Sequence, residues 1–199
     1  MSILIACEES QTSCIAFRKL GYEAFSCDIQ PCSGGHPEWH IQEDVSSILY
    51  DNWDLVIAHP PCTYLAKVGL VKYFDKNSKS LSIDRYFSMI KARDFFFMFV
   101  NYGMAGNRIC IENPMPHRYA CLPPCSQVIQ PYMFGDFYSK YTCLWLYNLP
   151  PLFAKYGYSQ LRSIPDSISW TSKHSTSKAR SKSFAGISAA MAKQWGKLI

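Results

Sequence analysis

The sequence contains no long hydrophobic run. A helix that crosses a bilayer needs about 20 consecutive apolar residues, and the most apolar stretch, residues 95–100, directly follows a charged segment. The first apolar run is short and lacks the basic residues with which a secretory leader begins. We therefore expect a protein that does not use a membrane, and we expect its nine cysteines to stay reduced in the cytoplasm.

The sequence also lacks a strong excess of charge. Its 199 residues, of which 48% are hydrophobic and 15% aromatic, suit one globular catalytic domain spanning residues 1–199. The net charge of +5 permits a partner that carries phosphate groups without requiring one. Residues 150–184 differ because they are rich in proline, serine and basic side chains. Such a composition is typical of a solvated loop, which could also follow a nucleic-acid backbone.

The first predicted turn contains no glycine. Residues 2–7 are apolar like a buried strand, residues 8–13 are polar, and a helical pattern begins at Cys14. A strand, a polar turn and a helix start in this order open a Rossmann-like unit, although dinucleotide-binding folds normally place glycines in that turn. The alternation continues along the chain, and we predict an α/β fold with a mostly parallel sheet and helices on both faces.

A buried strand predicted over residues 55–58 ends at two prolines, and Cys62 follows them. Ligands of open α/β sheets bind beyond the carboxyl ends of the strands, so this thiol stands where a nucleophile is useful. The alternative is a buried, unreactive cysteine, which is the commoner state of a free thiol. The proline turn favours the first interpretation because it is stiff and fixes the direction of the side chain.

A second apolar strand, residues 108–111, runs into Glu112, Asn113 and Pro114. If the two strands are neighbours, they bring Glu112 and Cys62 to the same edge of the sheet. A thiolate adds to the sixth carbon of a pyrimidine only if the ring nitrogen is protonated or hydrogen-bonded as charge develops, and a carboxylic acid can supply that proton. The addition turns the fifth carbon into a nucleophile.

These two motifs, Pro60-Pro61-Cys62 and Glu112-Asn113-Pro114, resemble those of the cytosine-5 DNA methyltransferases, in the short form found in phage and prophage genomes. The resemblance implies a Rossmann-like S-adenosylmethionine-dependent methyltransferase fold. It implies further that Cys62 is the covalent nucleophile and that Glu112 holds and protonates the base.

The resemblance also implies where the rest of the substrate site lies. Pro61 and Asn113 belong to the two motifs and are expected to contact the base. The family carries a glutamine and two arginines just before a later strand, and one arginine reaches the cytosine carbonyl. Lys140 and Thr142 stand there in this chain. Residues 63–84 are expected to form a loop that closes over the base. Independently of the resemblance, the pattern of residues 83–102 predicts a long amphipathic helix.

The implied cofactor is S-adenosylmethionine. Asp28 is placed to accept hydrogen bonds from the ribose hydroxyls, and Asp44 with Val45 would hold the adenine, although Asp44 is equally plausible as a helix N-cap. Polar side chains of the first turn would replace the missing glycines, and the helical pattern of residues 186–199 resembles the family's last motif, which folds back beside the cofactor. The predicted cofactor-binding residues are Cys7, Glu8, Glu9, Ser10, Thr12, Asp28, Asp44, Val45 and Pro60.

Cys32, His36 and His40 lie in a loop rich in proline and glycine and suggest a metal site. Structural zinc sites usually contain close pairs of cysteines, and no such pair completes a ligand set near this loop. We therefore predict that the protein binds no metal there.

Three functions fit these residues. The first is methyl transfer to carbon 5 of cytosine in DNA. Larger family members insert a recognition domain for which 199 residues leave no room, so we expect sequence specificity to be low or to come from an accessory protein. The second keeps the thiol addition but acts on a free cytidine nucleotide or RNA. The third is a non-catalytic nucleic-acid-binding protein that retains the fold, which the glycine-free turn favours. Assays with dCMP and with an oligonucleotide separate the first two, and DNA binding without cofactor marks the third.

Overall fold

The computed structural model describes residues 1–74, 80–155, 168–169 and 182–199. Its centre is a mixed sheet of seven strands: β1 (Ser2–Ala6), β2 (Glu23–Cys27), β3 (His40–Ile41), β4 (Leu55–Ala58), β5 (Ile109–Pro114), β6 (Gln127–Ile129) and β8 (Thr142–Tyr147). A separate parallel pair is formed by β7 (Tyr138–Ser139) and β9 (Ile168–Ser169).

The strand order of the large sheet is β3-β2-β1-β4-β5-β8-β6. The first five strands of this order run parallel, whereas β8 is antiparallel to both of its neighbours, β5 and β6. The chain moves outward from β1 to β3 and then returns to place β4 on the other side of β1. In open α/β sheets, ligands commonly bind beyond the carboxyl ends of the strands at such a reversal, which lies here between β1 and β4.

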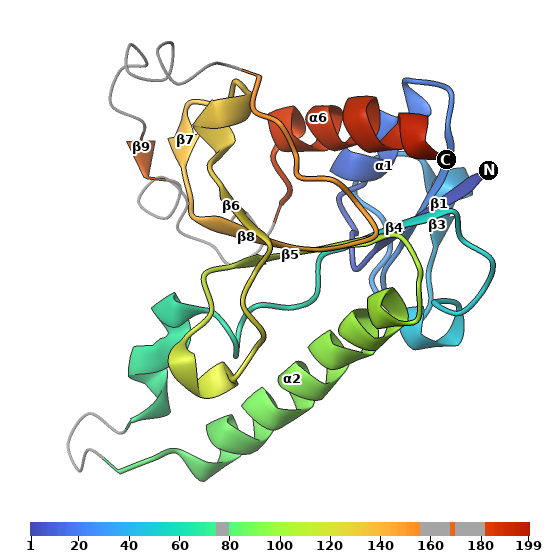
Figure 1. Cartoon of the computed structure of the whole chain (residues 1–199). Coiled ribbons are helices and arrows are strands. Elements are labelled where there is room, and N and C mark those ends of the chain that lie inside the picture. Colours follow the sequence, from blue (N-terminus) through green and yellow to red (C-terminus); the bar gives the residue numbers. More distant parts are fainter. Residues whose placement is uncertain (75–79, 156–167, 170–181) are drawn as a thin grey trace.

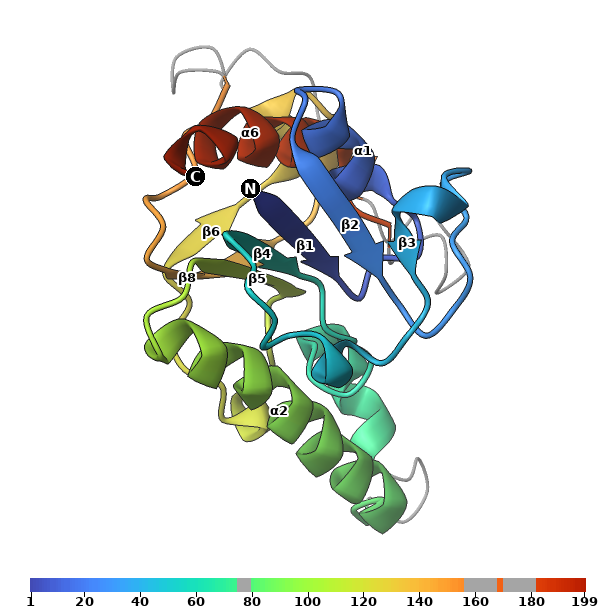
Figure 2. The same cartoon turned by 90° about the vertical axis from the view of Figure 1, so that its right-hand side faces the viewer.

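Helices cover both faces of the sheet. Figure 1 shows α1 (Thr12–Arg18) and α6 (Ala185–Trp195) on one face and α2 (Ile83–Met104) on the other, and the turned view of Figure 2 shows the same layers. The described 3-10 helices are η1 (Pro37–Trp39), η2 (Val45–Ser47), η3 (Lys67–Tyr73), η4 (Arg118–Ala120), η5 (Pro131–Phe134) and η6 (Gly196–Leu198). The predicted α/β fold with a mostly parallel sheet is thus confirmed.

Side chains of the central strands alternate between two cores, because successive residues of a strand point to opposite faces. The upper core lies between the sheet and the pair α1 and α6, and it includes Ile3, Ile5, Phe17, Leu55, Ile57, Cys110, Met191 and Trp195. The lower core lies between the sheet and α2, and it includes Leu4, Ala6, Val56, Ala58, Phe96, Phe99, Ile109 and Ile111. Burial on both faces explains why these strands are continuous apolar runs.

The two long predicted helices are present. The helix predicted from residue 83 extends to Met104, and its Phe96 ring packs edge-on against Trp145 of β8 with ring centres 5.0 Å apart. The predicted C-terminal helix is α6, and its Ile187, Met191 and Trp195 are buried. None of the helices in the described ranges combines the length and apolar character that a membrane-spanning segment requires.

Candidate active site

Parallel strands deliver several of the predicted site residues to one edge of the sheet. Cys7, Asp28 and His59 directly follow β1, β2 and β4, while Glu112 lies in the second half of β5. β4 and β5 are parallel neighbours, as the two motifs predicted. The backbone N–H of His59 donates to the Ala6 carbonyl at 2.9 Å, which ties the end of β4 to the end of β1.

The two motifs are joined by two side-chain hydrogen bonds. His59 Nδ1 lies 3.0 Å from Glu112 Oε2, and Asn113 Nδ2 donates to the Pro60 carbonyl at 2.7 Å. The side chains of His59 and Glu112 are 11% and 17% exposed, so water screens their interaction little. The chain that leads to Cys62 is therefore held against the acidic end of β5. Asn113 itself is 1% exposed and positions this chain rather than facing an open site.

Glu112 and His59 change each other's protonation. Burial alone would raise the pKa of Glu112, but the hydrogen bond from His59 and the positive charges of Lys140 and His59 outweigh it, and the pKa is lowered. Burial alone would lower the pKa of His59, but the hydrogen bond and negative charge of Glu112, with the charge of Glu8, raise it. The pair therefore favours a carboxylate beside an imidazolium.

Glu112 and Lys140 line the same pocket. His59 also lines it, and α6 closes it from the other side with Ser188 and Met191. The Lys140 ammonium lies 5.6 Å from the centre of the Phe184 ring, just before α6. An acid, a base and apolar side chains thus meet in one place. The free space among these side chains is about 10 Å³, which is room for about one water molecule.

Thr142 has a different position from the one predicted. Its side chain is 1% exposed, and its hydroxyl donates to the Lys140 carbonyl at 3.1 Å. Thr142 begins β8, where it pairs with Pro114 in the sheet register. The prediction that Thr142 contacts substrate is therefore replaced by a role in fixing the backbone of Lys140.

Cys62 is half-buried and begins a turn. Its carbonyl accepts hydrogen bonds from the backbone N–H groups of Leu65 and Ala66 at 3.0 and 2.9 Å. Pro60 before it is buried and Pro61 is exposed. Cys62 is not among the side chains that line the pocket of Glu112 and Lys140, so sulfur and carboxyl belong to adjoining strand ends rather than to one enclosed cavity.

The segment that follows Cys62 runs beside the segment that follows Pro114. The backbone N–H of Lys67 donates to the Met115 carbonyl, and that of His117 donates to the Leu65 carbonyl, each at 2.9 Å. The predicted loop of residues 63–84 is wrong for Lys67–Tyr73, which form η3, because these backbone bonds organise the chain there. Residues 75–79 of that prediction lie outside the described residues.

Burial makes most of the other cysteines poor nucleophiles, because the thiolate is the reactive form. It raises the pKa of Cys14 and Cys143 to about 12 and that of Cys27 to about 11. It raises the pKa of Cys110 well above its ordinary value, and the pKa of Cys7 is also raised. These five thiols stay protonated near neutral pH.

The glycine-free turn after β1 is closed by its own side chains. Glu8 is 3% exposed, and its two carboxylate oxygens accept hydrogen bonds from the backbone N–H groups of Ser13 and Cys14 at 2.7 and 3.1 Å. It thus stabilises the first turn of α1, and the expectation that Glu8 offers a free acceptor to a cofactor is wrong. The hydroxyls of Ser10 and Thr12 lie 3.1 Å apart and bond each other.

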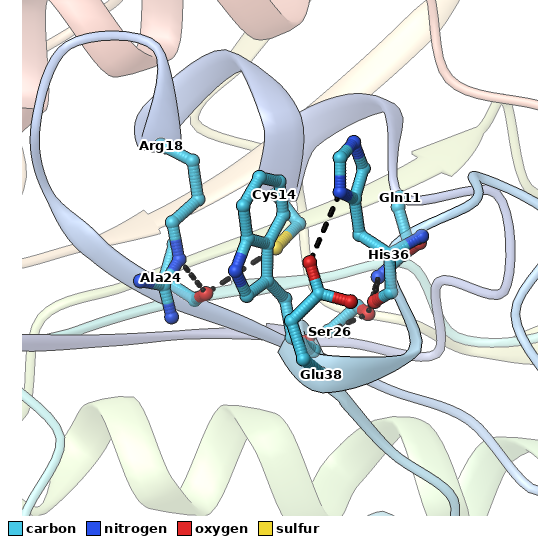
Figure 3. Close-up of polar contacts among 8 residues, drawn as sticks. Gln11, Cys14, Arg18, Ala24, Ser26, His36 and Glu38 are labelled. Atoms are coloured by element: carbon cyan, nitrogen blue, oxygen red, sulfur yellow. Dashed lines mark hydrogen bonds and ion pairs between the residues drawn. The ribbon is translucent and has the colours of Figure 1, made fainter.

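The loop after β2 lies over this turn. Gln11 donates to the His36 carbonyl at 2.8 Å and accepts from the His36 N–H at 3.1 Å, as Figure 3 shows. The Ser33 N–H donates to the Glu9 carbonyl at 2.8 Å. Gly34 approaches so closely that a Cβ there would lie 2.5 Å from Gln11 Cβ, which only glycine allows. The side of the turn that meets this loop is therefore covered.

The predicted residues for the adenosine part of a cofactor lie together. The negative charges of Asp28 and Asp44 both contribute, after burial, to the raised pKa of Cys7. Asp44 Oδ1 accepts from the Ser46 N–H at 2.9 Å, which confirms its role as a helix N-cap, here of η2. Val45 is 4% exposed and packs in the lower core. Asp28 and Asp44 thus place two carboxylates near Cys7, whereas the carboxylate of Glu8 is taken up by the backbone of α1.

The histidines of the loop after β2 have other partners. His36 stacks on Trp39 with ring centres 3.9 Å apart, and its Nδ1 lies 3.2 Å from Glu38 Oε1. His40 Nδ1 lies 2.9 Å from Ser26 Oγ. Within the described ranges, no group of three or more histidine, cysteine or acidic side chains is arranged to hold a metal ion.

Sequence analysis missed His59. The signal available was an ionisable residue placed between a buried strand and a proline pair, where a side chain is aimed by the fold. The predicted basic segment, residues 150–184, falls largely on residues 156–167 and 170–181, which lie outside the described residues. Lys182 is described and lines the pocket of Glu112.

No protein-family model matches the chain, and no curated protein is significantly similar to it.

Proposed function

We propose that the protein transfers a methyl group from S-adenosylmethionine to carbon 5 of cytosine in DNA, through a covalent bond between Cys62 and carbon 6. The observation that carries this proposal is the junction of the two motifs. Asn113 holds the Pro60 carbonyl and Glu112 holds His59, so the proline-cysteine turn and the acid are fixed side by side. The mostly parallel sheet, whose strand order reverses between β1 and β4, supports a Rossmann-like methyltransferase fold.

The polar side chains that line this pocket offer groups that can hydrogen-bond a cytosine placed over them. Glu112 can accept from the exocyclic amine and bond the ring nitrogen, while the Lys140 ammonium can donate to the ring carbonyl. Lys140 would thus bind the cytosine carbonyl, as an arginine does in the family that the chain resembles. Cys62 lies on the turn that follows β4, half-buried and next to the exposed Pro61. A base bound over the two strand ends would have the thiol on one side and the acid at its edge.

The chemistry divides between these side chains. S-adenosylmethionine, when bound, supplies an electrophilic methyl group. Cys62 attacks carbon 6 as a thiolate, which makes carbon 5 electron-rich. Glu112 holds the ring nitrogen and provides the proton that stabilises the negative charge. Asp28 and Asp44 are the residues proposed to hold the adenosine part.

Methyl transfer to an oligonucleotide, to dCMP and to RNA tests the proposal and its substrate alternatives together. We expect radiolabel from S-adenosylmethionine to appear in the DNA with the wild type and with Cys121→Ala, which changes an exposed cysteine. We expect Cys62→Ala to lose transfer by at least about 100-fold, in the range of covalent catalysis. Retained transfer in Cys62→Ala would reject the nucleophile, and transfer only to dCMP or RNA would reassign the substrate.

A second function is favoured by the closed first turn. Glu8 occupies the amide groups of α1, and the loop at His36 covers Gln11. A nucleic-acid-binding protein that keeps the fold but binds no S-adenosylmethionine would not need the turn after β1 to be accessible to a cofactor. Calorimetric titration separates the two functions: heat of S-adenosylmethionine binding supports the enzyme, and DNA binding without it supports the second function.

A further inference from the structure

His59 has one nitrogen bound and one without a partner. Its Nδ1 lies 3.0 Å from Glu112 Oε2, while its Nε2 is buried and has no hydrogen-bond partner in the described part of the chain. The ring cannot easily move away, because the His59 N–H is bonded to Ala6 and Pro60 follows it. A buried nitrogen left unpaired costs about 1–3 kcal/mol, so its presence at a pocket points to function rather than to packing.

Charged groups from four segments surround this ring or line its pocket. Glu112 comes from β5, Glu8 from the turn after β1, Lys140 from the chain before β8, and Lys182 from the chain before α6. Burial and Lys140 work against a charge on His59, whereas Glu112 and Glu8 favour it and prevail. The raised pKa of His59 and the lowered pKa of Glu112 therefore favour a proton on the histidine and a charge on the acid, within the hydrogen bond that joins them.

An ionised Glu112 alone has no proton to give. When Cys62 adds to carbon 6, the new carbon–sulfur bond pushes the electrons of the carbon 5–carbon 6 double bond toward the ring carbonyl and ring nitrogen, and the nitrogen must gain a proton. Resting on the proposed function, we propose that His59 is the residue that stores this proton and passes it through Glu112 to the base.

The transfer balances without any further reactant. The ring nitrogen takes a proton from Glu112 Oε, Glu112 takes one from His59 Nδ1, and His59 becomes neutral. The proton returns by the same path when the carbon–sulfur bond breaks and Cys62 leaves as a thiolate. His59 is thus a positioning residue that acts through Glu112: when Nδ1 gives up its proton, the ring becomes neutral with its hydrogen on Nε2, and the returning proton is taken up again at Nδ1.

The test is the pH dependence of thiol addition, measured without a methyl donor. Reversible addition makes the hydrogen on carbon 5 of cytosine exchange with water, so tritium is released from an oligonucleotide labelled at that carbon. His59→Gln keeps an amide that can donate to Glu112 but cannot store a proton. We expect its release rate to fall by at least about 10-fold, in the lower range of general acid catalysis, and we expect the alkaline decline of the rate to move to lower pH.

His36→Gln is the matched control, because His36 forms the same kind of histidine–carboxylate pair with Glu38 on the surface. Figure 3 shows this pair beside Gln11. A merely structural role of His59 would lower the rate equally at every pH, and would overturn the inference. So would wild-type rates and an unchanged pH profile in His59→Gln.

Two further measurements keep the outcomes distinct. If His59→Gln fails to fold, nitrogen-15 NMR of the wild type replaces it: a His59 ring that is protonated at pH 7 supports the inference, and a neutral ring there overturns it. If the wild type itself neither releases tritium nor forms an adduct with 5-fluorocytosine, the proposed function fails first, and the inference falls with it.

Discussion

The His59–Glu112 pair should make the stability of the protein depend on pH. The lowered pKa of Glu112 stabilises the fold above its ordinary value of 4.5, and this contribution is lost as the pH falls. The raised pKa of His59 stabilises the fold below its ordinary value of 6.5, and this contribution is lost as the pH rises through the folded-state pKa. The pair therefore contributes most to the stability of the fold between about pH 4.5 and 6.5.

We expect Glu112→Gln to lower the free energy of unfolding more at about pH 5.5 than at about pH 9, because the contribution of the raised His59 pKa is lost as the pH rises. Urea unfolding at the two pH values measures this difference. Glu38→Gln, at the exposed pair, is the control and should lower stability little at either pH. An equal effect of Glu112→Gln at both pH values would contradict the assigned ion pair.

Glu8 should be a residue of stability rather than of cofactor binding. Its carboxylate satisfies two backbone N–H groups at the start of α1 and is 3% exposed. Glu8→Ala leaves both groups unpaired, and we expect a loss of about 1–3 kcal/mol in the free energy of unfolding. Glu8→Gln keeps one oxygen that can accept from these N–H groups, so its free energy of unfolding should fall less than that of Glu8→Ala.

Thermal unfolding of these variants, with Glu23→Gln on the exposed side of β2 as control, checks the prediction for Glu8. A wild-type melting temperature in Glu8→Ala, together with weakened binding of S-adenosylmethionine, would contradict this prediction and show that Glu8 takes part in cofactor binding.

The role of a single residue could be predicted from the sequence where it depends on the local backbone, and could not where it depends on a partner brought near by folding. Asp44 was recognised as an N-cap because the signal is local. The roles of Glu8 and Thr142 were not recognised, because their partners, the amides of α1 and the Lys140 carbonyl, depend on how a turn folds back on itself. His59 was missed because its role depends on a hydrogen bond to Glu112, which is 53 positions away in the chain.

At the level of elements, α2 is held to the sheet by a close approach at Gly103. A Cβ on Gly103 would collide with the ring and Cβ of Tyr147 on β8. We expect Gly103→Ala to lower the free energy of unfolding by about 1–3 kcal/mol through overpacking, although alanine favours helix. Met104→Ala, at a neighbouring position that is 74% exposed, should have little effect. Chemical unfolding followed by circular dichroism distinguishes the two, and equal stability of the two variants would argue against this packing.

Element positions were largely predictable, because apolar runs of four to six residues and helical periodicity are local signals. β4, β5 and α2 appear where the sequence placed them. η3 was not predicted, since it depends on the backbone bonds between Lys67 and Met115 and between Leu65 and His117. The pairing of segments distant in sequence leaves no mark in composition.

At the scale of the whole molecule, the described residues form one large sheet with helices on both faces and a small two-stranded sheet, with no further domain among them that could read bases. The proposed enzyme should therefore discriminate weakly between cytosines in different sequence contexts. A site with one wrong base pair typically loses about 1–3 kcal/mol in a sequence-specific protein, and we expect less than this here. Methylation of a random-sequence oligonucleotide pool, read by bisulfite sequencing, measures the context preference. A sharp consensus in the absence of other proteins would contradict the expectation.

The bond between Cys62 and carbon 6 of cytosine is the central claim. A DNA oligonucleotide with 5-fluorocytosine traps this bond, because fluorine cannot leave carbon 5 as a proton does. Mass spectrometry after incubation with S-adenosylmethionine should find the oligonucleotide joined to the peptide that contains Cys62, in the wild type and in Cys121→Ala, but not in Cys62→Ala. The absence of an adduct in the wild type, or an adduct on another cysteine, would contradict the account.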